Sequence, residues 1–206
     1  LLGFPKSGTT SFQTLFEKLN FKSYHQLYKD GQWITPLMKR QIQLGENLLD
    51  FIPKDERKIT CLTQIDQCLS KDINFWPQIT HYKELYYQNR DSIFILNKRD
   101  INSLLLSFKK QIYFNKSLYD RFIQYNKHLL PNNGTNDEKM LHLFKNHYKN
   151  ITDFFTKEKC KFIIYDIESD NINKLKKYID IKDIKDFPHK NKNKEKEGKK
   201  EEKKVI

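Results

Sequence analysis

One short stretch near the start of the chain limits the possible folds more than any other: GFPKSGTT, residues 3–10. It lies between an apolar pair and an amphipathic segment. In that segment apolar residues recur at helical spacing and predict a helix over residues 9–19 with one buried face: Phe12, Leu15, Phe16 and Leu19. A strand, a tight loop and a helix in this order place free N–H donors at the helix N-terminus, where proteins bind phosphate groups.

The glycine spacing of this octet is that of the nucleotide-binding P-loop, GxxxxGK[ST], but the cation is displaced. Thr9 stands where the P-loop has its lysine, and Lys6 comes three positions earlier. A P-loop kinase or ATPase needs that lysine on the β- and γ-phosphates and a hydroxyl on magnesium. The change indicates a loop that holds one phosphate with backbone N–H groups and places an ammonium at the bond that breaks.

A second anion site is predicted in the middle of the chain. Residues 92–96 form an apolar run typical of a buried strand, and Asp100 is a suitable N-cap for a helix over residues 100–110. Between them lies Arg99, and Ser107 follows it by eight positions, inside that helix. The planar guanidinium of an arginine suits a phosphate group.

Together these patterns resemble the sulfotransferases that use 3′-phosphoadenylyl sulfate (PAPS) as donor. That family has a 5′-phosphosulfate loop similar to PKSGTT, and an arginine and a serine, eight positions apart, on the 3′-phosphate. The resemblance covers roughly residues 1–190 and is closer to the divergent Golgi-type and microbial branches, because the lysine-threonine-histidine stretch of the cytosolic enzymes is not found after the middle strand. It implies a three-layer α/β/α fold with a central, mostly parallel sheet, similar to that of P-loop NTPases.

The resemblance also implies roles for individual residues. Lys6 would be the catalytic cation, and Arg99 and Ser107 would hold the 3′-phosphate. The loop around the 5′-phosphosulfate would comprise Pro5, Lys6, Ser7, Gly8, Thr9, Thr10 and Ser11. Lys190 follows a Phe-Pro-His segment similar to one late in some divergent members; it would either close over the 3′-phosphate or simply begin the tail. The product would be 3′-phosphoadenosine 5′-phosphate (PAP), and no metal would be required.

Two residues are candidates for the general base that takes the proton of the acceptor hydroxyl. Asp66 follows the middle strand and is slightly favoured, because a carboxylate just past a parallel strand faces the site. His25 follows the first helix, at about the point where several Golgi-type relatives carry a catalytic glutamate. As an alternative, either residue serves only as a cap or a loop hydrogen-bonding group.

The rest of the chain alternates strands with helices, as expected for a parallel sheet covered on both faces. Further strands are predicted at residues 1–4, 21–24, 59–63 and 161–167. Further helices are predicted at residues 34–49, with a soft break at Gly45, and at residues 76–88, 117–128, 137–155 and 171–178. Ligands of such sheets bind beyond the carboxyl ends of the strands. Both predicted anion sites follow strands, so they are expected to face the same region.

Positive charge is divided between a domain and a tail. The net charge is +12, and the eight lysines and four glutamates of residues 189–206 account for +4, which leaves +8 for residues 1–188. The tail has almost no apolar residue and is predicted to be disordered, so the domain is expected to span residues 1–188. The charge of the domain would attract a donor with two phosphate groups and a sulfate. It would attract RNA equally, but no specific nucleic-acid partner is predicted.

Three cysteines, at positions 61, 68 and 160, lack the spacing of metal or redox motifs. Their odd number is typical of a reducing compartment, so the cytoplasm is favoured over the Golgi lumen. No apolar run is long enough to span a membrane, and membrane attachment is expected only if an anchor precedes residue 1.

The acceptor stays open between a small molecule, a glycan and a peptide, and its attacking group would be a hydroxyl or an amine. Aromatic residues such as Tyr24, Trp33 and Phe75 would line an apolar or carbohydrate pocket, although aromatics at helical spacing more often form a core. Two other functions compete with sulfuryl transfer. One is a P-loop small-molecule kinase, which would need ATP and magnesium. The other is a non-catalytic relative that binds nucleotide, nucleic acid or a protein through its basic surface.

Overall fold

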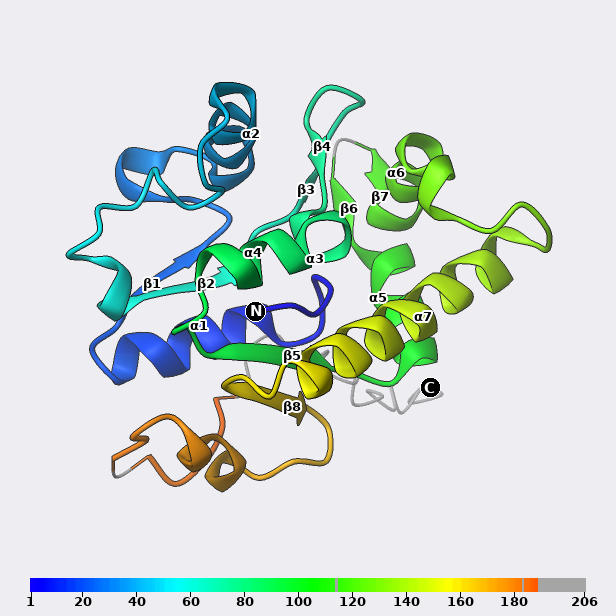
Figure 1. Cartoon of the computed structure of the whole chain (residues 1–206). Helices are drawn as coiled ribbons and strands as arrows, with labels where there is room; N and C mark the ends of the chain where they lie inside the picture. Colours follow the sequence, from blue (N-terminus) through cyan, green and yellow to red (C-terminus); the bar gives the residue numbers. More distant parts are fainter. Residues whose placement is uncertain (114, 183, 189–206) are drawn as a thin grey trace, which may run out of the picture.

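The computed structural model describes residues 1–113, 115–182 and 184–188. Strands and helices alternate along most of the chain, as the sequence predicts (Figure 1). The strands are β1 (Lys22–His25), β2 (Thr60–Gln64), β3 (Gln67–Cys68), β4 (Asn74–Phe75), β5 (Phe94–Lys98), β6 (Ile112–Tyr113), β7 (Lys116–Ser117) and β8 (Phe162–Asp166). The helices are α1 (Thr9–Lys18), α2 (Ile34–Leu44), α3 (Pro77–Thr80), α4 (Tyr82–Gln88), α5 (Ile101–Lys110), α6 (Leu118–Tyr125) and α7 (Asn136–Lys157), with short 3-10 segments η1 (Lys29–Gly31), η2 (Arg57–Ile59), η3 (Lys127–Leu129) and η4 (Ile172–Lys177).

Two parallel pairs of strands form the centre of the fold: β1 with β2, and β5 with β8. The first residues of the chain lie between the pairs, because the Leu1 amine donates to the Leu62 carbonyl (2.7 Å) and the Leu2 N–H donates to the Ile95 carbonyl (2.8 Å). The strand predicted for residues 1–4 is therefore not formed as a regular strand. Instead, this segment connects the two pairs into one layer.

Gly3 lies where this segment passes closest to β5. Its N–H donates to Asn97 Oδ1 (2.9 Å), and a Cβ atom at this position would lie 2.1 Å from the Asn97 carbonyl oxygen. No side chain fits there, so the close approach of the two backbones requires glycine. The approach fixes the point at which residues 5–8 leave the sheet.

Helices cover both faces of the layer. On one face, α5, α6 and α7 pack with Leu96 in a core cluster that includes Phe4 and Phe144. On the other face, α1 and η4 pack against Ile95, with Phe12 in the same cluster. Ile95 and Leu96 are neighbours in β5 and face opposite clusters, as expected for a strand buried on both sides. The predicted three-layer α/β fold is confirmed, although its sheets are small.

Several local predictions are wrong. The helix predicted for residues 34–49 ends fully at the predicted break, because Gly45 has a left-handed backbone (φ 70°) and residues 46–49 do not continue the helix. The helix predicted for residues 76–88 is divided into α3 and α4 at His81, whose backbone is not helical (φ −131°), and residues 171–178 form only the 3-10 segment η4. Two antiparallel hairpins, β3–β4 and β6–β7, were not predicted, because two-residue strands leave no periodic pattern.

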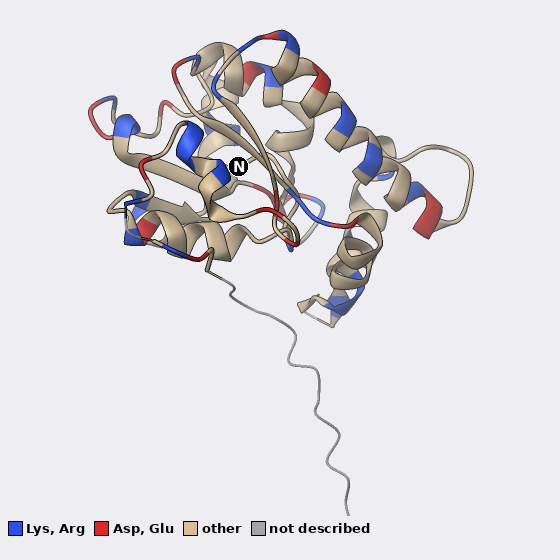
Figure 2. Ribbon diagram, turned by 90° about the horizontal axis from the view of Figure 1, so that it is seen from below, with Lys and Arg blue, Asp and Glu red and all other residues tan. Residues whose placement is uncertain are grey.

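Charged residues occur along several helices and loops, with both signs present (Figure 2). Among the described residues no helix is both long and apolar enough to cross a bilayer. The predicted tail, residues 189–206, lies outside the described residues, so the domain boundary at residue 188 stays a prediction.

Candidate functional site

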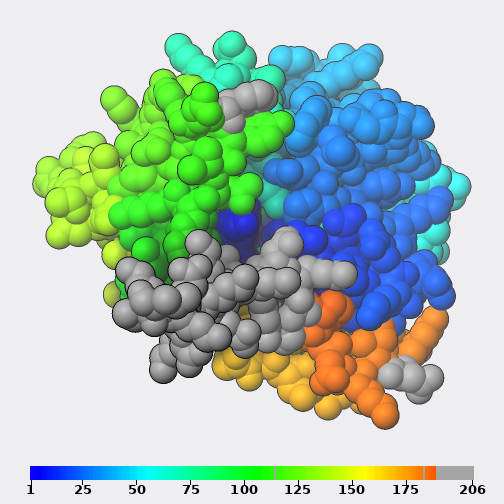
Figure 3. All heavy atoms as spheres, turned by 180° about the vertical axis from the view of Figure 1, so that it is seen from behind, coloured from blue at the N-terminus to red at the C-terminus, as the bar shows by residue number. Residues whose placement is uncertain are grey.

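One large pocket, of about 960 Å³, opens beyond the carboxyl ends of β1, β2 and β5. Its walls come from segments far apart in the sequence: the loop before α1, the residues just past these strands, and the region around the end of α5. Figure 3 shows a hollow with the first residues of the chain, in dark blue, between the green atoms of the α5–α6 region and the blue atoms that follow α1. The volume lies at the upper end of the range for small-molecule sites.

The loop at residues 5–8 is held from its buried side. The Ser7 hydroxyl donates to the Phe4 carbonyl, and Asn97 Nδ2 donates to the Ser7 carbonyl (3.0 Å) and to the Ser7 hydroxyl oxygen (2.7 Å). The side chain of Ser7 is therefore buried in the fold. Lys6 has a left-handed backbone (φ 70°), which is strained for a residue other than glycine and persists only where surrounding contacts hold it.

The N-terminus of α1 forms one wall of the pocket. Gly8 is its N-cap, with a left-handed backbone (φ 83°), and a Cβ atom there would lie 2.9 Å from Ile167 Cγ2, so both conformation and space favour glycine. No side chain caps this helix, and its first turn contains no acidic residue. The first-turn residues Thr9, Thr10 and Ser11 all line the pocket. Such a helix end attracts an anion.

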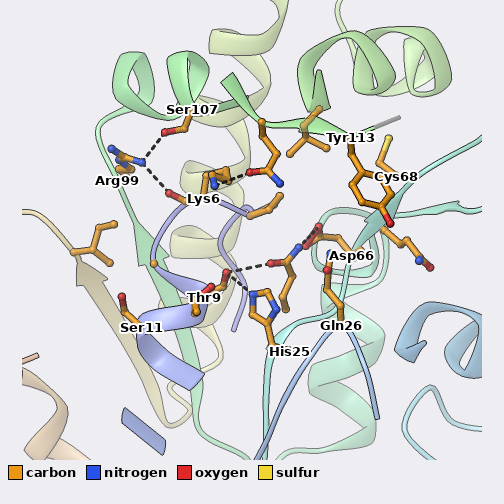
Figure 4. A pocket seen from close by; sticks show the side chains of 18 of the residues that line it. Lys6, Thr9, Ser11, His25, Gln26, Asp66, Cys68, Arg99, Ser107 and Tyr113 are labelled. Atoms are coloured by element: carbon orange, nitrogen blue, oxygen red, sulfur yellow. Dashed lines mark hydrogen bonds between the residues drawn. The ribbon is translucent and has the colours of Figure 1, made fainter. Parts of the chain in front are cut away.

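Arg99 connects this loop to α5. Its Nη1 donates to the Lys6 carbonyl (3.0 Å) and to Ser107 Oγ (2.8 Å) (Figure 4). Its Nε donates to Glu168 Oε1 (3.1 Å). The spacing of eight residues thus brings the serine hydroxyl to the guanidinium. Arg99, Ser107 and Lys6 all line the same pocket.

The Lys6 ammonium lies in this pocket and donates to Gln111 Oε1 (2.8 Å), just past the end of α5. Burial lowers the pKa of Lys6, and the nearby Arg99 guanidinium lowers it further. Two cations therefore face one cavity, an arrangement that favours a ligand with several negative charges.

His25, at the end of β1, contacts the first turn of α1. Thr9 Oγ1 lies 3.0 Å from His25 Nε2 and donates to Gln64 Oε1 (3.1 Å). Burial is the main cause that lowers the pKa of His25; its own backbone opposes this, and the charge of Lys6 adds to it. The imidazole is therefore neutral at neutral pH and has a nitrogen that accepts a proton.

Asp66, two residues past β2, is almost completely buried in the pocket wall. Its Oδ1 accepts from Gln78 Nε2 (3.1 Å) and its Oδ2 accepts from Gln64 Nε2 (3.2 Å). Burial raises the pKa of Asp66 to about 7, although these amide hydrogen bonds oppose the change. A substantial fraction of this carboxyl is therefore protonated at neutral pH.

The pocket brings together most of the predicted site residues: Pro5, Lys6, Gly8, Thr9, Thr10, Ser11, His25, Asp66, Arg99 and Ser107. The side chain of Ser7 packs into the fold instead, and Lys190 lies outside the described residues.

Several polar residues of the pocket were not predicted from the sequence: Gln26, Gln64, Gln67, Gln111, Arg121 and Glu168. Gln26 and Gln64 stand at the ends of β1 and β2, so the rule that drew attention to Asp66 would have indicated them. Gln111 and Arg121 follow no such rule, because only the packing of α5 and α6 brings them to the cavity.

Among the described residues no group of three or more His, Cys, Asp or Glu side chains is arranged to hold a metal ion. A search of curated proteins gave no match. A family model described as a sulfotransferase domain matches residues 1–196, nearly the whole chain and all the pocket residues described above. The chain therefore belongs to the sulfotransferase family, whose members transfer sulfuryl groups.

Proposed function

We propose that this sulfotransferase takes its sulfuryl group from PAPS and transfers it to an acceptor hydroxyl, with PAP as the product. The observation that carries the proposal is the position of Arg99, whose Nη1 donates to Ser107 Oγ (2.8 Å) and to the Lys6 carbonyl (3.0 Å). One guanidinium thus joins two anion-binding elements, and its partner at Lys6 lies 93 residues away in the sequence. A donor with phosphate groups at both ends of an adenosine needs two such elements in one cavity.

The residues of the pocket fit this donor. The uncapped N-terminus of α1, with no acidic residue in its first turn, suits the 5′-phosphate. Arg99 and Ser107 supply a charged fork and a hydroxyl that suit the 3′-phosphate. Lys6 supplies a second cation in the same cavity. The protein groups in this part of the pocket are backbone N–H groups, hydroxyls and cations, and such groups bind phosphate directly.

In sulfuryl transfer, a bond forms between the acceptor oxygen and sulfur, and the bond between sulfur and the bridging oxygen breaks. That oxygen leaves on PAP with the negative charge. The Lys6 ammonium and the first-turn N–H groups of α1 stabilise this growing charge. One well-placed hydrogen-bond donor of this kind lowers the activation barrier by about 3 kcal/mol.

His25 is the general base in this proposal. Its lowered pKa keeps the imidazole neutral, so it takes the proton of the acceptor hydroxyl as the new bond forms. Asp66 is slightly favoured by its position just past a strand, but the burial of that carboxyl and its raised pKa of about 7 favour His25. Both Asp66 oxygens also accept amide hydrogen bonds. We assign Asp66 to positioning: it holds Gln64, which accepts from the hydroxyl of Thr9.

Isothermal titration calorimetry tests the donor. We expect PAP to bind with micromolar affinity in the presence of a chelator, and ATP with magnesium to bind much more weakly. Preference for ATP with magnesium would contradict the proposal and favour a P-loop kinase.

Labelled-sulfate transfer from PAPS tests catalysis. With saturating PAPS and a mixed panel of phenols, sugars and peptides, we expect incorporation of label that Lys6→Ala abolishes. Lys18→Ala is the matched control, because Lys18 is an exposed lysine on α1 outside the pocket. PAP binding without any transfer would indicate a non-catalytic relative.

A further inference from the structure

The pocket extends well beyond the residues that the donor needs. Figure 4 shows Gln26, Asp66, Cys68 and Tyr113 on the opposite side of Lys6 from Arg99. Other residues complete this part of the cavity, which we call the acceptor end: Trp33, Gln64, Gln67, Leu69, Leu118 and Arg121. Its walls come from the β1–α2 connection, from the β2–β3 region and from the segment between α5 and α6.

Side-chain amides dominate the polar groups of the acceptor end. Each amide offers both a donor and an acceptor, the combination that matches a hydroxyl group. Gln67 is buried, and its Oε1 accepts from the Thr35 hydroxyl, but its Nε2 is buried without a partner among the described residues. A buried amide nitrogen with no partner is unusual and marks a place where a ligand or a water completes the hydrogen bonding.

Gln26 gives an independent sign that this end has a function. It has a left-handed backbone (φ 63°), and hydrogen bonds on both sides keep it there: its N–H donates to the Gln64 carbonyl (3.0 Å) and its carbonyl accepts from the Ile34 N–H (2.8 Å). Strain of this kind in a residue other than glycine tends to occur at ligand sites. Gln26 and Lys6 share this backbone conformation, and both line the pocket.

Arg121 and Asp66, at this end, have charged or titratable side chains. The Arg121 guanidinium is buried, and its Nη1 donates to the carbonyls of Tyr113 (2.7 Å) and Lys116 (3.1 Å), which fixes the β6–β7 hairpin. Asp66 carries little charge below its pKa of about 7. A purely apolar acceptor is not favoured here, because it would cover several amides without replacing their hydrogen bonds to water.

Aromatic surface accompanies the amides. The indole of Trp33 is 37% exposed although it lines the pocket. The other aromatics considered from the sequence take no part, since Tyr24 packs on Tyr28 and Phe75 packs on His81. An aromatic ring with an apolar face beside amide side chains is the combination that suits a ring with C–H groups on its face and hydroxyls around its edge.

We propose that the acceptor is a carbohydrate, whose hydroxyls are recognised by the amides of Gln26 and Gln67 and whose ring lies against Trp33. This inference rests on the proposed function, because it assigns the acceptor of the same site. His25 then faces the sugar hydroxyl that attacks sulfur and takes its proton. PAP is the leaving group, on the side of the pocket at Arg99.

The test uses the PAP-loaded protein and two methyl glycosides, methyl β-D-galactopyranoside and methyl N-acetyl-β-D-glucosaminide, with 2-naphthol and an acidic tyrosine peptide as alternatives. Binding is followed by saturation-transfer NMR and turnover by labelled-sulfate transfer from PAPS. We expect at least one glycoside to bind and to be sulfated at least tenfold faster than 2-naphthol or the peptide.

Substitutions at Trp33 and Gln26 test whether these residues bind the glycoside. Trp33→Ala and Gln26→Leu are each expected to raise the KM for the glycoside by about fivefold or more, the size expected for the loss of one neutral contact. The affinity for PAP should not change in either variant. Trp33→Phe keeps an aromatic ring and should restore most of the affinity, and Tyr87→Ala is the control for an exposed aromatic outside the pocket.

Two kinds of failure are distinguishable. If PAP binds but neither glycoside binds or is sulfated, or if 2-naphthol or the peptide is the better acceptor, the carbohydrate inference is wrong and the donor assignment is intact. An unchanged glycoside KM in both Trp33→Ala and Gln26→Leu also overturns it. If the unaltered protein does not bind PAP, the proposed function itself is contradicted.

Discussion

The two ends of the pocket are built from different chemistry. The end at Arg99 carries two cations, the uncapped N-terminus of α1 and the hydroxyl of Ser107. The acceptor end is dominated by the neutral amides of Gln26, Gln64 and Gln67. Fixed charge stabilises a multiply charged ligand strongly and over some distance, whereas amides discriminate through the geometry of short hydrogen bonds. We therefore propose that the charged end determines how tightly the donor binds and that the amide end determines which acceptor is used.

His25 and Asp66 show how burial can affect two titratable groups in similar positions differently. Each lies at or just past the end of a parallel strand, and each is linked to Thr9, His25 directly and Asp66 through Gln64. Burial favours the uncharged form of both. For the imidazole the uncharged form is the base, and for the carboxyl it is the conjugate acid. The same physical cause prepares His25 to accept a proton and makes Asp66 a poor acceptor.

The largest effect is expected at the charged end. Lys6→Ala should lower kcat by about 200-fold, because one preorganised hydrogen-bond donor at a developing charge contributes about 3 kcal/mol. The affinity for PAP should fall much less. Stopped assays with labelled PAPS measure kcat, and calorimetry measures the affinity for PAP. A variant in which PAP affinity falls as far as kcat would show that Lys6 binds the donor rather than the transition state.

A change at Asp66 is expected to alter stability in a pH-dependent way. The pKa of about 7 in the folded protein lies above the value of about 3.9 in an unfolded chain, so ionisation costs stability as the pH rises from about 4 to about 7. Asp66→Asn removes this cost, which is at most about 4 kcal/mol. We expect the variant to gain several degrees in Tm relative to the parent at pH 8.5 and little at pH 4.5. A Tm difference that is the same at both pH values would show that the carboxyl titrates normally.

His25→Gln should lower kcat by about 100-fold, the usual contribution of a general base, while Asp66→Asn should retain most of the activity at pH 7. In the parent, the acid limb of the kcat/KM profile should lie below about 6.5, since burial lowers the pKa of His25. The two variants are compared at saturating PAPS. If Asp66→Asn were the inactive one, the roles assigned to the two residues would be reversed.

Arg99→Ala should weaken PAP binding by about 30-fold, in line with the loss of hydrogen bonds to a charged group. Arg99→Lys keeps the charge but loses the fork and should recover only part of the affinity. Arg40→Ala, on the exposed face of α2, controls for the loss of a positive charge elsewhere. Equal affinities of Arg99→Ala and Arg40→Ala would show that Arg99 serves only the fold, through Glu168 and the Lys6 carbonyl.

How far the sequence predicts this site also differs between the ends. The charged end depends on local patterns. GFPKSGTT leads into the first turn of α1, and Asp100 caps α5 by accepting the Ser103 N–H (2.8 Å), which places Ser107 in the helix that follows Arg99. The acceptor end depends on packing between distant segments. Gln67 and Trp33 come from different connections, and neither has a neighbour pattern that indicates a ligand. The layers were predictable from hydrophobic periodicity, but the hairpins β3–β4 and β6–β7, which shape this end, were not.

Gln111 is the residue where the two ends meet, and its substitution should have the smallest effect. Its Oε1 accepts from the Lys6 ammonium (2.8 Å), and it directly precedes β6, whose Tyr113 borders the acceptor end. Gln111→Leu removes one neutral acceptor and should lower kcat/KM by about threefold to tenfold, the value of one ordinary hydrogen bond. Gln111→Glu should lower PAP affinity further, because a carboxylate beside Lys6 both competes for the ammonium and repels the donor. Equal PAP affinities of Gln111→Glu and Gln111→Leu would contradict this expectation. They would show that the Lys6 ammonium leaves Gln111 whenever PAP is bound. The hydrogen bond would then hold Lys6 only in the protein without PAP.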